Sequence, residues 1–396
     1  MNAKLYMVIL LMLSGVYNSY AEQKISFDFY GNTITIPVNQ AVKVPFTDGP
    51  SDNTIQAFYN KLNAGDYQPI IKELLVFKQK YQLNDWIYYQ LVRKTAQQIA
   101  PKADNYYRYT LYKWFLLNKS GYDATLATGN GLLCFYVRSD EMVYDIPYYM
   151  HDNKQYVCLN IHDYAGTAID NKSFEKINVV IPEGKNTFSY KVTQLPDFTP
   201  SDYITKDIEF DYGNEAYHFK VKLNKEVATI FKNYPVVDYA SYFNIPMSSE
   251  TYSSLIPALK KNVEGLNQKH GVDFLMRFTR NAFLYETDAQ AYGKEKRFSP
   301  EQTLLNTYSD CDDRAALFFY LVKEIYHLPM IALLYPTHIT IAVKFDKPIG
   351  NTITYNGNQY SVCEPTPQLE DLRVGQMLPE LKKVHYEVAY AYEPGK

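Results

Sequence analysis

Residues 308–322 place the strongest constraint on what this chain of 396 residues can fold into. From residue 315 to residue 322 the segment is apolar on nearly every face of a helix, so the helix has to be buried on all sides. Cys311 lies where its first turn begins. Unpaired N–H groups and the positive end of the helix dipole favour the thiolate at this position. The sequence therefore predicts a buried helix that presents a nucleophilic cysteine.

Two predicted strands downstream supply a base and an acid. His338 opens a strand in which apolar residues alternate with small or polar ones. A later strand at 359–364 alternates so that Glu364 lies on one face and Cys363 on the other. Cys311, His338 and Glu364 therefore follow one another along the chain in the order nucleophile, base and orienting carboxylate.

These segments resemble the transglutaminase-like superfamily of papain-type cysteine enzymes. The resemblance covers residues 253–366 and rests on three motifs: Asp-Cys-Asp-Asp-Arg-Ala at 310–315, Tyr-Pro-Thr-His at 335–338 and Tyr-Ser-Val-Cys-Glu-Pro-Thr at 360–366. It implies a Cys311, His338 and Glu364 triad on an α+β fold, in which the helix that bears the cysteine packs on an antiparallel sheet. The family usually has Asp where this chain has Glu364. The longer carboxylate can still accept a hydrogen bond from the His338 ring.

The resemblance also implies acyl transfer through a thioester, with the oxyanion held by the Cys311 N–H and a second donor. Tyr308, Asp310 and Asp313 are the candidates for binding the substrate or the oxyanion. We expect a peptidase or amidase that acts on peptide, protein or cell-wall peptide amides. A cross-linking transglutaminase, and a non-catalytic protein that binds peptide or polysaccharide, remain open as alternatives.

Composition narrows the range of partners. A net charge of −3 gives no electrostatic reason to expect nucleic acid. No HExxH, CxxC or glycine-rich phosphate loop occurs, so no metal and no cofactor are expected. The 39 tyrosines suit a surface that contacts carbohydrate or protein, and they serve equally well as strand and core residues; both interpretations stay open.

The first 21 residues predict an export signal, with Lys4, an apolar run at 5–13 and small residues before the cleavage site. The run is too short to span a bilayer. We therefore expect a soluble periplasmic or extracellular protein without a transmembrane anchor. In an oxidising compartment Cys134 and Cys158 could form a disulfide.

Periodicity divides the rest of the chain into four regions. We expect a β hairpin segment at 22–51, an α+β domain at 52–165, a small β-sandwich at 166–228 and the catalytic domain at 229–396. The sandwich prediction rests on four alternating segments between residues 177 and 221.

The domain at 52–165 has features of a degenerate copy of the catalytic domain. A shift of 206 residues aligns its helix and strands with the catalytic segment. The triad positions Cys311, His338 and Glu364 then fall on Asn105, Leu132 and, after a further shift of one, Leu159. Such a copy would have no triad and would be free to bind substrate. Two unrelated helix-plus-sheet domains remain the alternative.

Overall fold

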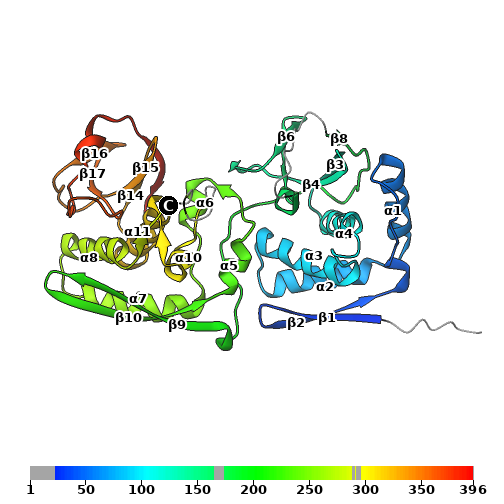
Figure 1. Ribbon diagram of the computed structural model, residues 1–396, viewed down its shortest axis with the longest axis horizontal. Coiled ribbons are helices and arrows are strands. Elements are labelled where there is room, and N and C mark those ends of the chain that lie inside the picture. Colours follow the sequence, from blue (N-terminus) through cyan, green and yellow to red (C-terminus); the bar gives the residue numbers. More distant parts are fainter. Residues whose placement is uncertain (1–22, 165–173, 288–289, 291–295, 396) are drawn as a thin grey trace, which may run out of the picture.

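The chain forms two lobes that lie side by side (Figure 1). The computed structural model describes residues 23–164, 174–287, 290 and 296–395; the predicted export signal lies outside the described residues. We call residues 23–198 the first lobe and residues 199–395 the second lobe. Both combine helices with antiparallel sheets, so the predicted α+β class is confirmed at this level. No helix within the described ranges is long and apolar enough to cross a membrane.

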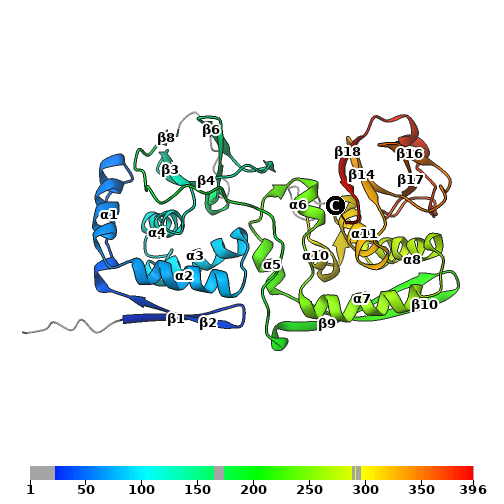
Figure 2. The ribbon, with the colours of Figure 1, turned by 180° about the vertical axis from the view of Figure 1, so that it is seen from behind.

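In the first lobe the helices lie between a β hairpin and a five-stranded sheet (Figures 1 and 2). The hairpin turns at Tyr30 and Gly31, where positive φ angles of 52° and 83° allow a tight reversal. The elements are β1 (Gln23–Phe29), β2 (Asn32–Val38), α1 (Asp52–Ala64), α2 (Gln68–Lys80), α3 (Asp85–Ile99), α4 (Tyr106–Lys119), β3 (Ala124–Gly129), β4 (Leu132–Arg138), β6 (Tyr148–His151), β7 (Lys154–Cys158) and β8 (Glu175–Lys176).

The second lobe repeats this layering, with a longer hairpin against its helices. The hairpin and helices are β9 (Tyr203–Tyr212), β10 (Glu215–Asn224), α5 (Glu226–Phe231), α6 (Tyr239–Phe243), α7 (Ser249–Val263), α8 (Gln268–Asn281), α10 (Pro300–Leu305) and α11 (Cys311–Tyr326). The strands are β12 (Leu284–Tyr285), β13 (Tyr308–Ser309), β14 (Met330–Tyr335), β15 (His338–Val343), β16 (Thr352–Tyr355), β17 (Asn358–Cys363) and β18 (Glu387–Tyr392). A short ladder between β5 (Val143–Tyr144) and β11 (Val236–Val237) connects the lobes.

The two five-stranded sheets have the same topology. Their strand orders are β6-β7-β4-β3-β8 and β16-β17-β15-β14-β18, and each sheet follows a helix that is buried along most of its length, α4 or α11. This is the arrangement expected of an internal repeat.

The register in which the two lobes match differs from the prediction at two of the three triad positions. Asn105 is the N-cap of α4, as Asp310 is of α11, so Tyr106 rather than Asn105 corresponds to Cys311. Cross-strand pairing likewise places Asn160, not Leu159, at the position of Glu364. A uniform shift fails because the connections between matched elements differ in length.

The predicted β-sandwich is wrong for the described part of residues 166–228. Two of the four expected strands, at 207–210 and 217–221, belong to the β9–β10 hairpin. The segments at 177–181 and 187–192 alternate between buried and exposed residues but form no ladder of their own. They pack against other parts of the first lobe instead: Phe188 N donates to Arg138 O, at the end of β4, at 2.7 Å. Alternation predicts extended backbone with one buried face, but it does not decide whether a second strand pairs with it.

Candidate active site

The N-terminus of α11 is fixed by a reciprocal cap that holds Cys311 in place. Asp310 accepts a hydrogen bond from Asp313 N at 3.2 Å, and Asp313 accepts one from Asp310 N at 3.5 Å. The Asp313 carboxylate also accepts from Phe298 N at 2.8 Å. Both aspartates, predicted as substrate or oxyanion residues, are buried and bind backbone groups. Their observed contacts orient the start of the helix.

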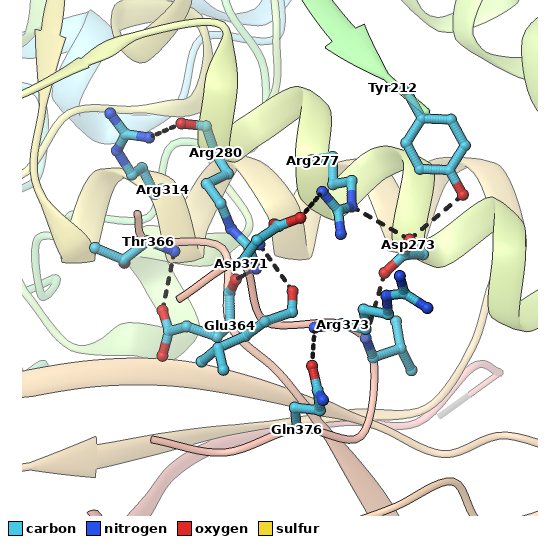
Figure 3. Close-up of polar contacts among 12 residues, drawn as sticks. Tyr212, Asp273, Arg277, Arg280, Arg314, Glu364, Thr366, Asp371, Arg373 and Gln376 are labelled. Carbon is cyan, nitrogen blue, oxygen red and sulfur yellow. Dashed lines mark hydrogen bonds and ion pairs between the residues drawn. The ribbon is translucent and has the colours of Figure 1, made fainter. Parts of the chain in front are cut away.

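Arg314 joins the same helix to the end of α8. Its side chain is fully buried and donates to the carbonyl oxygens of Thr279 at 3.2 Å, Arg280 at 2.6 Å and Phe283 at 2.9 Å (Figure 3 draws the Arg280 contact). Burial lowers the pKa of Arg314 to about 10, although the nearby Asp313 carboxylate opposes this shift. The guanidinium thus satisfies three carbonyls where α8 ends and fixes the position of α11 against it.

The predicted base and acid are in direct contact. His338 is the first residue of β15, and its Nε2 lies 2.8 Å from Glu364 Oε2. The other carboxylate oxygen accepts from Thr366 N at 2.9 Å (Figure 3). Glu364 is only 2% exposed. The extra methylene relative to Asp is accommodated because the side chain is bound at both oxygens.

Glu364 makes His338 a stronger base. Burial disfavours the charged ring, but the hydrogen bond that the ring donates to Glu364 and the negative charge of Glu364 outweigh this effect, so the pKa of His338 is raised. Because Nε2 faces the carboxylate, Nδ1 is the ring nitrogen that remains for proton exchange with a nucleophile.

Cys311 lies partly buried at the start of α11, next to the strand that carries His338. The backbone N–H of Ile339, the residue after His338, donates to its sulfur. Burial raises the pKa of the Cys311 thiol, and the carboxylates of Asp312 and Asp310 raise it further. Burial and these carboxylates therefore oppose the thiolate that the helix terminus favours. A raised thiol pKa makes attack on a carbonyl depend on a base.

An arginine network, which sequence reasoning missed, supports the backbone of Glu364 (Figure 3). Arg280 on α8 donates to the backbone oxygen of Glu364 and to Leu372 O, and it pairs with Asp371 at 2.9 Å. Arg277, one turn earlier, binds Asp371 at 2.6 Å. The spacing of the two arginines on one helix face was a usable signal, but their partner Asp371 lies in an irregular segment that no periodicity marks.

A second cluster flanks Cys311 on the side of the first lobe. The guanidinium of Arg297 stacks on the Tyr239 ring at 4.1 Å, donates to its hydroxyl at 2.9 Å and lies 4.0 Å from Asp312. Tyr239 in turn donates to Asp312 at 3.2 Å. Arg297 is half-buried and packs within the site.

The second oxyanion donor is not identified among the predicted residues. Tyr308 is 43% exposed on β13, which pairs in parallel with β12. Neither tryptophan is available as the second donor. Both belong to the first lobe, and their ring N–H groups are already bonded: Trp86 donates to Ile230 O of the second lobe, and Trp114 donates to Ala124 O. The backbone N–H at the start of α11 is therefore the donor that the fold itself supplies.

The cysteines other than Cys311 are buried, and all four thiols are free. Cys363 is fully buried on β17, and burial raises its pKa well above the ordinary thiol value. Cys134 and Cys158 lie on neighbouring strands and contact each other through their thiols. Their oxidation to a disulfide stays a prediction.

The matching positions of the first lobe hold no triad. Tyr106, Leu132 and Asn160 stand where the second lobe has Cys311, His338 and Glu364. Tyr106 Oη donates to Asp163 at 2.9 Å and accepts from Asn160 Nδ2 at 2.8 Å. Hydrogen-bonded packing thus takes the place of a nucleophile and its base.

Comparison with family models, with curated proteins and with solved structures finds no match for this chain. Among the residues that the structure describes, no group of three or more His, Cys, Asp or Glu side chains is arranged to hold a metal ion. The functional argument therefore rests on the geometry around Cys311.

Proposed function

We propose that this protein is a transglutaminase-like cysteine acyl-transfer enzyme that hydrolyses peptide or protein amides. The observation that carries the proposal is the 2.8 Å contact of His338 with the buried Glu364, on the strand whose next residue, Ile339, donates to Cys311. A base with a raised pKa, next to a thiol whose own pKa is raised, suits general-base activation of a nucleophile.

The reaction then proceeds in two halves. His338 Nδ1 takes the thiol proton as Cys311 Sγ bonds to the amide carbon, and Glu364 stabilises the imidazolium. The oxyanion accepts from the backbone N–H of Cys311 at the start of α11. When the C–N bond breaks, His338 returns the proton to the leaving amine. Water, deprotonated by the same ring, then attacks the thioester carbon. The C–S bond breaks, the acid leaves and the ring returns the proton to Cys311 Sγ.

The proposal can be tested by acetylation with p-nitrophenyl acetate, followed by peptide mapping in a mass spectrometer. We expect an acetyl group on Cys311, and a rate of modification that falls roughly 10²- to 10⁴-fold in His338→Ala because the general base is lost. The buried Cys363 serves as an internal control in the same digest. Acetylation that persists unchanged in His338→Ala, or that maps to another cysteine, would contradict the proposal.

The same assay separates hydrolysis from cross-linking. Addition of a small primary amine leaves the rate of thioester breakdown unchanged if water is the acceptor. A breakdown rate that rises in proportion to amine concentration, with an amide product, would favour a transglutaminase. If the protein is never acylated, the result would favour the alternative of a non-catalytic binding protein.

A further inference from the structure

Two adjoining cavities lie at the junction of the lobes, on the side of the site that carries Arg297. The larger has a volume of about 850 Å³ and is bounded by Trp86 and Tyr190 of the first lobe and by the segment after α5. The smaller has a volume of about 470 Å³ and extends along α3. Lys232 and His162 line both, so the two cavities adjoin; together we call them the inter-lobe groove. Its size is that of a site for a ligand of several residues.

The groove is basic although the chain as a whole carries a net charge of −3. Only two acidic residues, Asp145 and Asp163, are among the residues that line it, and Asp163 is neutralised by Lys102 at 2.6 Å. The cationic side chains that line it are Arg93, Lys94, Lys102, Lys232, Lys296 and Arg297. His162 adds no charge at neutral pH, because burial lowers its pKa to about 4. Positive charge gathered in a cleft attracts anionic ligands.

Two buried polar groups on the groove lack partners within the described part of the chain. The hydroxyl of Tyr190, whose side chain is fully buried, lines the larger cavity, and Gln90 Nε2 lines the smaller. A buried polar group without a hydrogen bond is costly, typically by about 1–3 kcal/mol. A bound ligand with polar atoms along its length would satisfy both groups once it displaced the side chains that cover them.

Arg297 links the larger cavity to the residues beside the candidate nucleophile. It lines that cavity and also stacks on Tyr239 beside Asp312, the residue that follows Cys311. An extended chain that left the groove past Arg297 would run toward Cys311. This arrangement favours a peptide, whose amide groups can both satisfy the orphaned polar atoms and present a carbonyl to Cys311.

We infer that the inter-lobe groove binds an acidic peptide chain and directs it to Cys311. The inference deepens the proposed function and rests on it for the direction of the peptide, but binding itself needs no chemistry at the cysteine. The first lobe supplies most of the groove wall, so the lobe without a triad would act in substrate selection.

Binding is measured in Cys311→Ala, so that failure of catalysis cannot hide it. The probes are three pools of acetylated and amidated hexapeptides, free of Trp and Tyr, that carry two Glu, two Gln or two Lys at otherwise randomised positions. Titration calorimetry gives the affinity, and the emission of Trp86, which lines the groove, reports occupancy. We expect the Glu pool to bind more tightly than the matched Gln pool, the Lys pool to bind least, and the Glu pool to weaken with added salt.

The matched variants are Lys232→Gln in the groove and Lys260→Gln on the exposed end of α7. Because Lys232 is a single exposed charge, its loss should weaken the Glu pool roughly two- to fivefold, while Lys260→Gln should leave the affinity unchanged. Equal affinity of the Glu and Gln pools, absence of binding, or binding that does not change Trp86 emission would overturn the inference. A sulfated oligosaccharide that competes as well as the Glu pool would overturn the assignment to peptides. If Cys311 is acetylated but acidic peptides do not bind, the proposed function would stand and only the inference about the inter-lobe groove would be refuted.

Discussion

Replacement of Glu364 by Gln tests whether this carboxylate sets the protonation state of His338. Glu364 accepts from Thr366 N at 2.9 Å and contacts His338 Nε2 at 2.8 Å. The side chain is 2% exposed, so water cannot replace either partner. Glutamine offers one acceptor oxygen for two donors. If that oxygen accepts from Thr366, the amide NH₂ faces Nε2, and the single ring proton moves to Nδ1, the nitrogen that has to receive the Cys311 proton.

The size of the effect follows from these contacts. Loss of a hydrogen bond to a charged group costs about 1.5–3 kcal/mol, which is roughly 10- to 150-fold in rate. The wrong tautomer of the His338 ring slows the reaction further. Replacement of the triad carboxylate by its amide in a serine enzyme lowers turnover by about 10⁴. We expect acetylation of Cys311 in Glu364→Gln to be slower by about 10²- to 10⁴-fold.

The alternative orientation of the new amide has its own cost. If its oxygen accepts from His338, the NH₂ group faces Thr366 N–H, and two buried donors meet at an expected cost of about 1–3 kcal/mol in the free energy of unfolding. Glu364→Asp is the control, because it keeps the charge and the tautomer; it should retain more activity than Glu364→Gln. Nitrogen NMR of the His338 ring reports the tautomer directly. Acetylation within about threefold of wild type, at unchanged stability, would refute the assigned role of Glu364.

Two further predictions concern stability. The raised pKa of His338 stabilises the folded state below about pH 6.5, the ordinary histidine value. The difference in free energy of unfolding between wild type and Glu364→Gln should therefore be largest there and shrink as pH rises through the folded pKa; a pH-independent difference in urea unfolding would contradict this. Arg314→Met should cost at least about 3 kcal/mol, since three carbonyls lose their donor, whereas the exposed Arg373→Met should change stability by less than about 0.5 kcal/mol.

The sequence predicted the buried helix and the strands around the site because their patterns are local. The apolar run after Cys311 and the alternation after His338 correspond to α11 and β15. The contact between His338 and Glu364 was expected from the resemblance to transglutaminase-like enzymes, and it joins the start of β15 to the residue that follows the neighbouring strand β17.

Other features depend on contacts between distant segments, which periodicity does not encode. The thiolate expected at Cys311 came from the helix terminus alone, whereas burial and two aspartates act in the opposite direction. The roles of Asp310 and Asp313 changed for a similar reason, because a carboxylate near a helix start looks the same in sequence whether it binds a ligand or caps the helix. The supports from Arg280 and Asp371 join residues about 90 positions apart.

The repeat gives a physical reason for the proposed division of labour between the lobes. In the first lobe Tyr106 fills the position of Cys311 and is tied to Asp163 and Asn160 by hydrogen bonds. Recovery of a triad there would require three coordinated substitutions, and each alone would leave a buried polar group unpaired. The surface of the first lobe that faces the groove carries no such constraint. Basic side chains can accumulate along α3 at little cost to stability, because exposed charges contribute little either way. The residues of the first lobe that line the groove can therefore be substituted, and the choice of substrate changed with them, without disturbing the triad in the second lobe.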